Sequence, residues 1–364
     1  MHKKSSLKAR RILFLPKYAH NAASTRYRVI QYIPYLKSLN IDCAVVPLLS
    51  EAYLKVKFKT GKTLYFEILK GFLKRIWVVL WAAKYDLVVI YCEALPYFPA
   101  ILEKYLKLRR IPYVFDFDDA IFHAYGQHKY WIVRWVFRKK IGVVVGGARQ
   151  VVAGNRYLAQ YAEALNSNVR IIPTVVDTNR YPEKKYTVSA KNKFTIGWIG
   201  SPSTAVYLKT IGKILQQFSR DHDVRIILVG SGPINIPNLT LEIRQWAENT
   251  EIRDIQDFDV GIMPLPDTLW ARGKCGFKLI QYMACGLPVI ASCIGANKEI
   301  IDNNKNGFLV ESSEEWYNAL AALYKDVNLR KSMGSAGRLK AIQQYSLQSV
   351  AHSLSLLLTG AIEK

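Results

Sequence analysis

The feature that most constrains the fold is an alternation of short apolar runs with amphipathic, helix-length segments. It occurs twice along the 364 residues. In the first series we predict strands at Ile12–Leu15, Asp42–Leu48, Leu87–Tyr91, Pro112–Asp116, Gln150–Ala153 and Val169–Ile172. Helical spacing of apolar residues predicts helices at Arg26–Leu39 and Tyr97–Leu108. Strands that alternate with helices predict βαβ units and a parallel sheet.

The alternation stops at a segment rich in proline and charge, residues 174–193, which we interpret as a linker. It then restarts, with strands predicted at Phe194–Ile199, Val224–Val229, Phe258–Met263, Pro288–Ala291 and Gly307–Val310. Helices are predicted at Ala205–Phe218 and Phe277–Ala284, and two more amphipathic helices end the chain. We therefore predict two Rossmann-like, doubly wound α/β domains at 1–173 and 194–345, and a C-terminal helix at 346–364 that packs back on the first. Such sheets bind ligands beyond the carboxyl ends of their strands, so we expect the site in a cleft between the domains.

The formal charge of +23 is concentrated in the first half of the chain. Residues 1–180 contain 30 Lys and Arg against 11 Asp and Glu, whereas residues 181–364 contain 21 against 17. This imbalance predicts a negatively charged partner for the first half: anionic lipid, nucleic acid or a phosphorylated substrate. A basic surface that only keeps the chain soluble is the alternative.

Targeting and redox signals favour a cytoplasmic protein. The basic N-terminus runs directly into an apolar run that is too short for a secretory signal. The longest dense apolar run, Ile76–Ala83, falls short of the roughly 18 residues of a membrane-spanning helix. The five cysteines are scattered without metal-binding spacing, so we expect reduced thiols, no bound metal and no cofactor.

The segment with the most informative chemistry is 272–290, whose pattern predicts a loop, a short helix and a strand. A helix N-terminus attracts phosphate, whereas cations there oppose the helix dipole, so cations at this end indicate a bound anion. Gln281, one turn further on, is placed to bond sugar or ribose hydroxyls. A surface loop with incidental lysines explains the pattern equally well. The loop and the first turn carry Arg272, Lys274, Gly276 and Lys278.

The run Lys278–Ser292 resembles the donor-site signature of family 4 glycosyltransferases, which have the GT-B fold. Further resemblances to this family cover Ile172–Asp177, Phe258–Leu265, Gly295–Ile301 and Asn306–Leu309. The resemblance implies a nucleotide-diphosphate sugar donor, hexosyl transfer that usually retains configuration, and no obligatory metal.

Two departures from the family pattern bear on the donor site. Many members carry two glutamates eight residues apart, where this chain has Gly273 and Gln281. Many also carry Arg and Lys after the first strand of the second domain, where this chain has Gly200–Thr204 without a cation. We therefore expect lysines to replace the missing charge, with Lys278 at the β-phosphate. The expected donor site comprises Gly200, Ser201, Arg272, Lys274, Gly276, Lys278 and Gln281.

Polar residues also follow the strands predicted in the first half. Asp116, Asp118 and Asp119 end one strand, and their mutual repulsion raises at least one pKa, which suits acid or base catalysis. Metal binding and capping of the next helix by Asp119 are the alternatives. An Asp-Asp pair here resembles a subgroup of the same family, which favours Asp118 and Asp119 as catalytic or acceptor-contacting residues.

The segment Asn21–Arg28 resembles the family's loop and helix start that face the inter-domain cleft. We expect Ser24, or Thr25, to cap this helix and Arg26 and Arg28 to bind a phosphate of donor or acceptor; a solvated basic helix start is the alternative. Asn155 follows another strand and either lines the cleft or caps the next helix.

Two stretches, 55–84 and 129–140, interleave lysine and arginine with tryptophan, tyrosine and phenylalanine. This pattern is typical of a segment that binds an anionic membrane surface, and it also occurs in nucleic-acid binders. A third interpretation is that the aromatic residues are simply core residues. We favour the membrane and expect no nucleic-acid partner. The chain is thus expected to be a cytoplasmic glycosyltransferase, peripheral at the inner membrane face. Its expected acceptor is a polysaccharide or lipid-linked glycan in surface glycan or lipopolysaccharide synthesis. A nucleotide-sugar epimerase of related fold and a non-catalytic nucleotide-sugar-binding protein are the alternatives.

Overall fold

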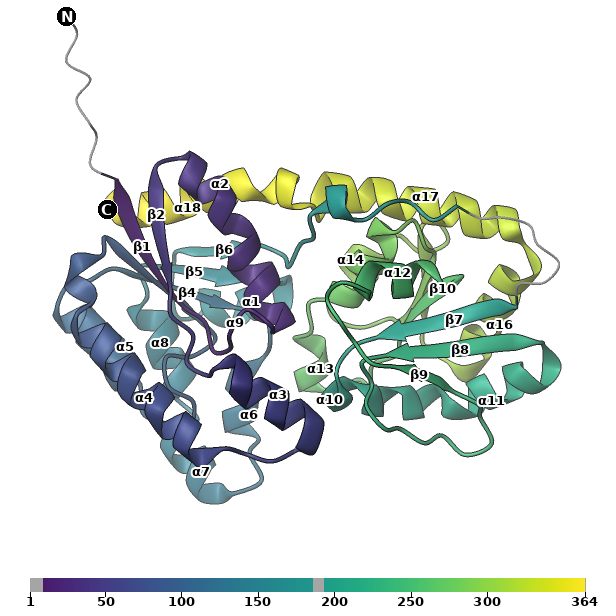
Figure 1. Ribbon diagram of the computed structural model, residues 1–364, viewed down its shortest axis with the longest axis horizontal. Coiled ribbons are helices and arrows are strands. Elements are labelled where there is room, and N and C mark those ends of the chain that lie inside the picture. The colour runs from purple at the N-terminus through teal and green to yellow at the C-terminus, as the bar shows by residue number, and fades with distance from the viewer. Residues whose placement is uncertain (1–8, 186–192, 364) are drawn as a thin grey trace, which may run out of the picture. The chain divides into compact units, whose positions relative to one another are not determined.

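The computed structural model describes residues 9–185 and 193–363 (Figure 1). The chain divides into two compact units. The first ends at Thr174 and includes the chain again from Val350, and the second comprises Val175–Ser349. Of the expected linker 174–193, residues up to 185 are described, and 186–192 lie outside the described residues.

The first unit is built on one parallel sheet with the strand order β2-β1-β3-β4-β5-β6. Its middle strands β3 and β4 are almost wholly apolar and buried, as are the last four residues of β1, as expected for strands covered on both faces. The strands are β1 (Arg10–Leu15), β2 (Ile41–Val45), β3 (Leu87–Tyr91), β4 (Tyr113–Phe117), β5 (Gln150–Ala153) and β6 (Val169–Ile171).

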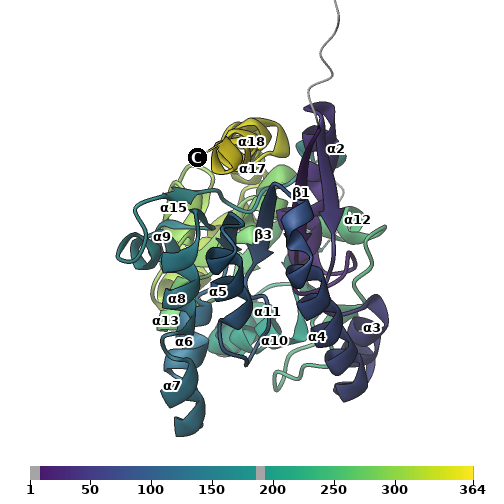
Figure 2. The same ribbon diagram turned by 90° about the vertical axis from the view of Figure 1, so that its left-hand side faces the viewer.

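Helices connect the strands of this sheet. Figure 2 looks onto α4 to α8, where α4 packs on α5, α5 on α8, and α8 on α6 and α7. The helices are α1 (Ala23–Arg28), α2 (Ile33–Ser38), α3 (Glu51–Thr60), α4 (Tyr65–Leu80), α5 (Ile101–Leu108), α6 (Ile121–Gly126), α7 (Trp131–Phe137), α8 (Lys140–Gly147) and α9 (Arg156–Glu163). Short 3-10 turns are η1 (Ile30–Tyr32) and η2 (Ala82–Lys84).

The single helix predicted at Arg26–Leu39 is wrong. The chain forms α1, η1 and α2 instead, because Val29 leaves helical geometry and Pro34 begins a new helix. Proline has no amide hydrogen to continue the ladder, so a break just before it leaves less backbone unpaired.

The second unit contains another parallel sheet, of order β12-β11-β10-β7-β8-β9. One hydrophobic cluster joins its strands to α11 and α16, with Trp198, Phe218 and Trp316 among its largest members. The strands are β7 (Phe194–Ile199), β8 (Val224–Val229), β9 (Glu242–Arg244), β10 (Val260–Met263), β11 (Val289–Ser292) and β12 (Gly307–Val310).

Most helices of the second unit are short. They are α10 (Pro202–Ala205), α11 (Gly212–Asp221), α12 (Glu251–Gln256), α13 (Leu269–Arg272), α14 (Phe277–Ala284) and α15 (Asn297–Ile300), with turns η3 (Thr178–Arg180) and η4 (Val206–Ile211). The chain ends with three long helices rather than the two predicted: α16 (Ser313–Lys325), α17 (Val327–Gln344) and α18 (Leu347–Glu363). No helix in the described part of the chain is long and apolar enough to span a bilayer.

Candidate functional site

The turn after β7 lies at the middle of the second sheet. Neighbouring strands leave β7 in opposite directions of chain order, with β8 on one side and β10 on the other. In doubly wound sheets this switch of direction opens a crevice at the carboxyl ends of the strands. Gly200 and Ser201 occupy the turn, and the Gly200 amide donates to Val229 O at 3.0 Å. The Ser201 hydroxyl lies 2.9 Å from that of Ser203, at the start of α10.

The side chain of Lys278 lies against this turn. Its Nζ is 5.3 Å from the centre of the buried Trp198 ring, within cation–π range. A Cβ added at Gly200 would come within 2.7 Å of Lys278 Cε and 2.6 Å of Trp198. Glycine at 200 is therefore what allows the lysine to approach the end of β7. The structure brings together Gly200, Ser201 and Lys278, as the predicted donor site requires.

Helix α14 is fixed to the sheet by Tyr282. Its hydroxyl accepts the Ile199 amide at 2.9 Å, and its ring occupies the space that a side chain at Gly261 would need. The helix starts at Gly276, which has a left-handed φ of 65° and would clash with Ile300 Cδ1 at 2.2 Å if it carried a Cβ. The backbone thus places the N-terminus of α14, with Lys278 in its first turn.

The other two cations precede α14: Arg272 ends α13, and Lys274 lies on the loop between the two helices. Lys274 Nζ is 5.1 Å from the centre of the Trp270 ring. Arg272 donates to both oxygens of Asp267, at 2.7 and 2.9 Å, and this lowers the pKa of Asp267. Arg272 is exposed, so the pair leaves it in contact with solvent.

Gln281 points into the second unit. It is 3% exposed, and its amide donates to the Tyr181 hydroxyl at 3.4 Å. Tyr181 in turn donates to Glu251 at 3.3 Å, and Trp246 Nε1 donates to the same carboxylate at 2.7 Å. The sequence did not predict this buried network. In this network the Gln281 amide donates its hydrogen bond to a protein hydroxyl, whereas we had expected it to bond hydroxyls of a sugar or ribose.

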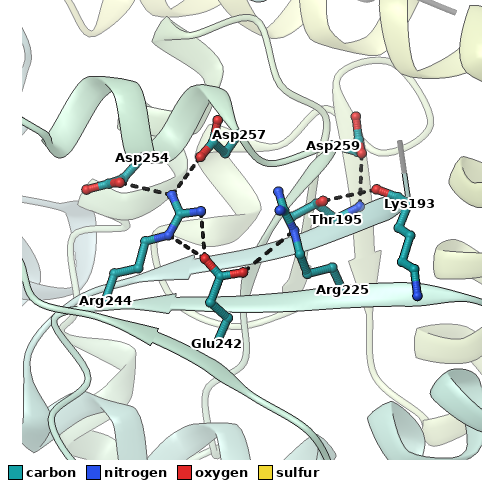
Figure 3. A network of polar contacts seen from close by, with 8 residues as sticks. All are labelled: Lys193, Thr195, Arg225, Glu242, Arg244, Asp254, Asp257 and Asp259. Atoms are coloured by element: carbon teal, nitrogen blue, oxygen red, sulfur yellow. Dashed lines mark hydrogen bonds and ion pairs between the residues drawn. The ribbon is translucent and has the colours of Figure 1, made fainter. Parts of the chain in front are cut away.

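A second unpredicted network fixes the end of β9 (Figure 3). Arg244 pairs with Glu242 at 2.7 Å, with Asp254 at 3.0 Å and with Asp257 at 2.6 Å. Burial opposes the charge of Arg244, but these carboxylates together raise its pKa. The network ties β9 to α12 and so positions the intervening segment that carries Trp246.

In the first unit, Arg28 and Asp116 form a buried pair. The Arg28 guanidinium donates to both Asp116 oxygens and to Ile172 O at 2.7 Å. Burial raises the pKa of Asp116, and the charge and hydrogen bonds of Arg28 oppose the rise without cancelling it. Arg28 and Arg26 are both buried, so the alternative of a solvated basic helix start is wrong. The charge of Arg28, expected for a phosphate, is matched by a carboxylate of its own unit.

Asp118 lies beyond the end of β4 and accepts the hydroxyl hydrogen of Tyr91, from the neighbouring strand β3. Burial and, to a smaller extent, the charge of the Asp119 carboxylate raise the pKa of Asp118 to about 6, although Arg28 and the Tyr91 hydroxyl oppose the rise. The sequence predicted such a rise from mutual repulsion of the carboxylates, whereas burial is the larger cause. A group with this pKa exchanges a proton near neutral pH, as acid or base catalysis requires.

The structure excludes one alternative for Asp119. The N-cap of α6 is Ala120, so Asp119 does not cap that helix as considered. Within the described residues no group of three or more His, Cys, Asp or Glu is arranged to hold a metal ion.

Two further polar residues have local structural roles. Ser24 and Thr25 lie inside α1, whose N-cap is Ala22, so the predicted capping role is wrong. Thr25 instead donates to Tyr18 O at 2.8 Å. Asn155 accepts the Leu158 amide at 2.9 Å and caps α9, which was one of its two predicted roles.

Sequence reasoning missed Lys17 and Cys92 at the same edge of the first sheet. Lys17 follows β1 and Cys92 follows β3; β3 lies between β1 and β4 in the sheet. Burial of Lys17 opposes its charge and so lowers its pKa. The charges of Tyr18, Glu93 and Cys92 outweigh this effect and raise the pKa of Lys17. Cys92 has a left-handed φ of 63°, which is uncommon outside glycine and is often found at functional sites. Neither residue belongs to a motif, so only the parallel topology identifies them.

Comparisons with known proteins support the second unit most directly. Residues 193–326 match the family model described as glycosyl transferases group 1. The chain is 26% identical over 182 residues to N-acetyl-alpha-D-glucosaminyl L-malate synthase of Bacillus anthracis; these are 46% of this chain and 45% of that protein. It is 24% identical over 272 residues to a GDP-mannose-dependent alpha-(1-6)-phosphatidylinositol monomannoside mannosyltransferase of Mycobacterium tuberculosis, covering 65% and 68%. The chain thus spans less than half of the length of the first of these relatives.

Solved structures resemble nearly the whole chain. Sucrose-phosphate synthase from Thermosynechococcus elongatus superposes with a TM-score of 0.68 at 13% identity, covering 96% of this chain and 98% of that one. HepE from Anabaena in complex with UDP and glucose gives a TM-score of 0.66 at 16% identity, covering 96% and 100%. Residues 193–326 are thus similar to the group 1 glycosyl transferases, and the two parallel sheets with their helices have the two-domain Rossmann-like architecture of the GT-B fold.

Proposed function

We propose that this chain is a glycosyltransferase whose second unit binds a nucleotide-diphosphate sugar at the carboxyl end of β7. The observation that carries the proposal is the contact of Lys278 with Gly200 and Trp198 beside the N-terminus of α14. A lysine and the positive end of a helix converge there on the place where doubly wound sheets bind phosphates. Lys274 on the adjoining loop and Arg272 at the end of α13 add positive charge.

The same groups have a role in transfer. When the bond from sugar to diphosphate breaks, negative charge develops on the β-phosphate. A fixed lysine and a helix N-terminus stabilise this charge without reorganising. Because these cations do what a divalent metal does elsewhere, we propose that transfer needs no metal. We place the chain in a branch of family 4 in which lysines and Gln281 replace the paired glutamates.

Asp118 and Asp119 are the proposed acceptor-contacting residues of the first unit. With a pKa of about 6, Asp118 is mostly ionised at neutral pH and accepts a hydrogen bond from an acceptor hydroxyl. A retaining outcome is the expectation for this family. We assign no covalent nucleophile.

The proposed acceptor is a glycan or a lipid-linked glycan of surface polysaccharide or lipopolysaccharide synthesis, used at the inner face of the membrane by a cytoplasmic, peripheral enzyme. Support comes from the mycobacterial relative, whose name includes a phosphatidylinositol mannoside. The net positive charge of residues 1–180 agrees with an acceptor or surface that carries phosphate.

The first experiment is a thermal-shift screen of UDP-, GDP- and ADP-sugars with the full chain. A donor at 100 times its Kd stabilises a fold by about 2.7 kcal/mol, so the right nucleotide raises Tm clearly. Incubation with the labelled donor then identifies the product, with and without EDTA. Labelled glycan or free sugar supports a transferase, whereas epimerised nucleotide-sugar indicates the epimerase. Binding without turnover indicates the non-catalytic protein, and no response to any donor contradicts the proposal.

A further inference from the structure

Helix α4 in the first unit carries a stripe of apolar residues on its outward side. Phe66, Leu69, Leu73, Trp77 and Leu80 recur at helical spacing, and each is between 45% and 76% exposed. A helix on the surface of a globular protein normally turns this kind of stripe towards the core. Because exposed apolar patches are costly in water, a continuous stripe of this length marks a surface that contacts something.

The buried side of α4 explains why the helix does not rotate to hide the stripe. Gly71 lies so close to the chain that a Cβ there would meet Leu48 O at 2.2 Å. One turn on, Arg75 is 1% exposed and donates to four carbonyl oxygens, those of Leu15, Pro16, Val46 and Ala94. Rotation of α4 would leave these carbonyl oxygens and the guanidinium without hydrogen-bond partners. The inward side of the helix is therefore fixed, and the apolar stripe remains outside.

Helix α7 repeats the arrangement on the same layer of helices. None of its seven residues is buried, and Trp131, Ile132 and Trp135 are more than half exposed. It packs on α8, which packs on α5 and thus leads to α4. In this series of packed helices, α5 comes between α4 and α7, and it adds the exposed apolar residues Ile101 and Leu108. We call the outward residues of α4, α5 and α7 the apolar face; Figure 2 looks onto the helices that carry it.

Positive charge surrounds the apolar face. On α4, Lys70 and Lys74 flank the stripe, and both are exposed. Lys62 and Lys84 lie just beyond the two ends of the helix, and Lys129, Arg138 and Lys139 flank α7. Among the residues of α4 and α7, Glu67 is the one acid, and it accepts the hydroxyl hydrogen of Ser50 at 2.9 Å. The face therefore combines tryptophan and leucine in the centre with lysine and arginine at the rim.

We propose that the apolar face docks the chain on an anionic lipid bilayer, with α4 and α7 lying in the interfacial plane. Tryptophan prefers the headgroup level, leucines enter the acyl boundary, and rim cations meet anionic headgroups. Nucleic acid fits less well, because the exposed leucines Leu69, Leu73 and Leu80 between the aromatic side chains offer a base no stacking and a phosphate no charge. A second copy would bring two cationic rims together.

The test is co-sedimentation of the full chain with vesicles in the absence of any donor. We expect binding to vesicles of phosphatidylcholine with phosphatidylglycerol, little binding to phosphatidylcholine alone, and weakening by salt. Leu73→Ser with Trp77→Ser, and separately Trp131→Ser with Trp135→Ser, are expected to abolish binding. Lys70→Gln with Lys74→Gln is expected to weaken it more than tenfold, since each cation near the surface contributes about fivefold.

Matched variants control for general changes of surface. Leu339→Ser and Leu356→Ser remove leucines that are equally exposed outside the apolar face, and Lys213→Gln with Lys331→Gln removes two exposed lysines of the second unit. These are expected to bind vesicles as the parent chain does. Trp77→Phe keeps the apolar contact, so it is expected to bind while showing a smaller blue shift of tryptophan fluorescence.

Four results would overturn the inference: vesicle binding that the α4 and α7 variants leave intact, equal binding to neutral vesicles, tighter binding of poly(U) at the same residues, or self-association without lipid that these variants remove. Because no donor is present, a negative result leaves the proposed transfer activity untouched. Donor-induced thermal stabilisation, measured on the same variants, confirms that they are folded.

Discussion

Gly200 sets the distance between the turn after β7 and the Lys278 side chain. In Gly200→Ala, the new Cβ needs space held by Lys278 Cε and the Trp198 ring, so the lysine has to move. We expect donor affinity to fall about tenfold or more, because a hydrogen bond to a charged group contributes about 1.5–3 kcal/mol. Titration with the donor measures this. The exposed Val206→Ala on the following turn is the control, and equal affinities of Gly200→Ala and parent would contradict the assignment.

Asp118 gives a pH-dependent stability of known sign. Its folded pKa of about 6 lies above the ordinary aspartate value of 3.8, so the folded state holds its proton between these pH values and the unfolded state does not. Its contribution is present below pH 4 and is lost as pH rises through 6. We therefore expect Asp118→Asn to be more stable than the parent at pH 7, by about 1–3 kcal/mol, with the difference vanishing near pH 4.

Urea unfolding of parent and Asp118→Asn at the two pH values checks this expectation. Asp119→Asn is the comparison variant at the adjoining position. A stability difference between parent and Asp118→Asn that stays constant between pH 4 and pH 7 would show that the carboxyl group is not buried as described.

The position of Lys278 at the start of a helix was predictable and the partner of Arg28 was not, for a physical reason. A glycine loop followed by a lysine at a helix start is a local pattern, and its interpretation depends on neighbours within a few residues. The partner of Arg28 is Asp116, 88 residues away, and a single sequence gives no sign that the two meet. Gln281 was assigned to hydroxyls for the same reason, because its partner Tyr181 lies 100 residues earlier.

At the scale of elements, α4 depends on one glycine. Gly71→Ala places a Cβ 2.2 Å from Leu48 O, a backbone atom that has no side-chain freedom to yield. We expect a loss of about 1–3 kcal/mol of stability from the forced shift, although alanine is the better helix former. Gly360→Ala in α18 has open space around its Cβ and is expected to be neutral or slightly stabilising. Chemical denaturation compares them, and equal stabilities would contradict the close packing of α4.

The prediction of elements succeeded where an element is long, apolar and bounded by clear breakers. Leu87–Tyr91, Phe194–Ile199 and Phe277–Ala284 have the predicted bounds. The strand Glu242–Arg244 was missed because it has three residues, none of them fully buried, at the edge of the sheet. Arg26–Leu39 kept its apolar face but not its continuity, because helical spacing does not record a break at Val29.

At the scale of the molecule, the two series of alternating elements correspond to two parallel sheets. In each sheet the first strand of the unit has later strands on both sides, which is what doubly wound topology requires. The return of the chain from Val350 to the first unit depends on which elements lie close in space. The apolar face was visible in sequence as two basic-aromatic stretches, but which aromatics are core residues and which are exposed was decided by the fold.

The central claim is that Lys278, at the start of α14, holds the diphosphate of a nucleotide-sugar. Isothermal titration of the parent chain, Lys278→Ala and the exposed Lys213→Ala, with the nucleotide-sugar that stabilises the fold most, tests it directly. The account predicts that the parent and Lys213→Ala bind equally and that Lys278→Ala shows no measurable binding while its thermal unfolding is unchanged. Undiminished affinity of Lys278→Ala would contradict the account.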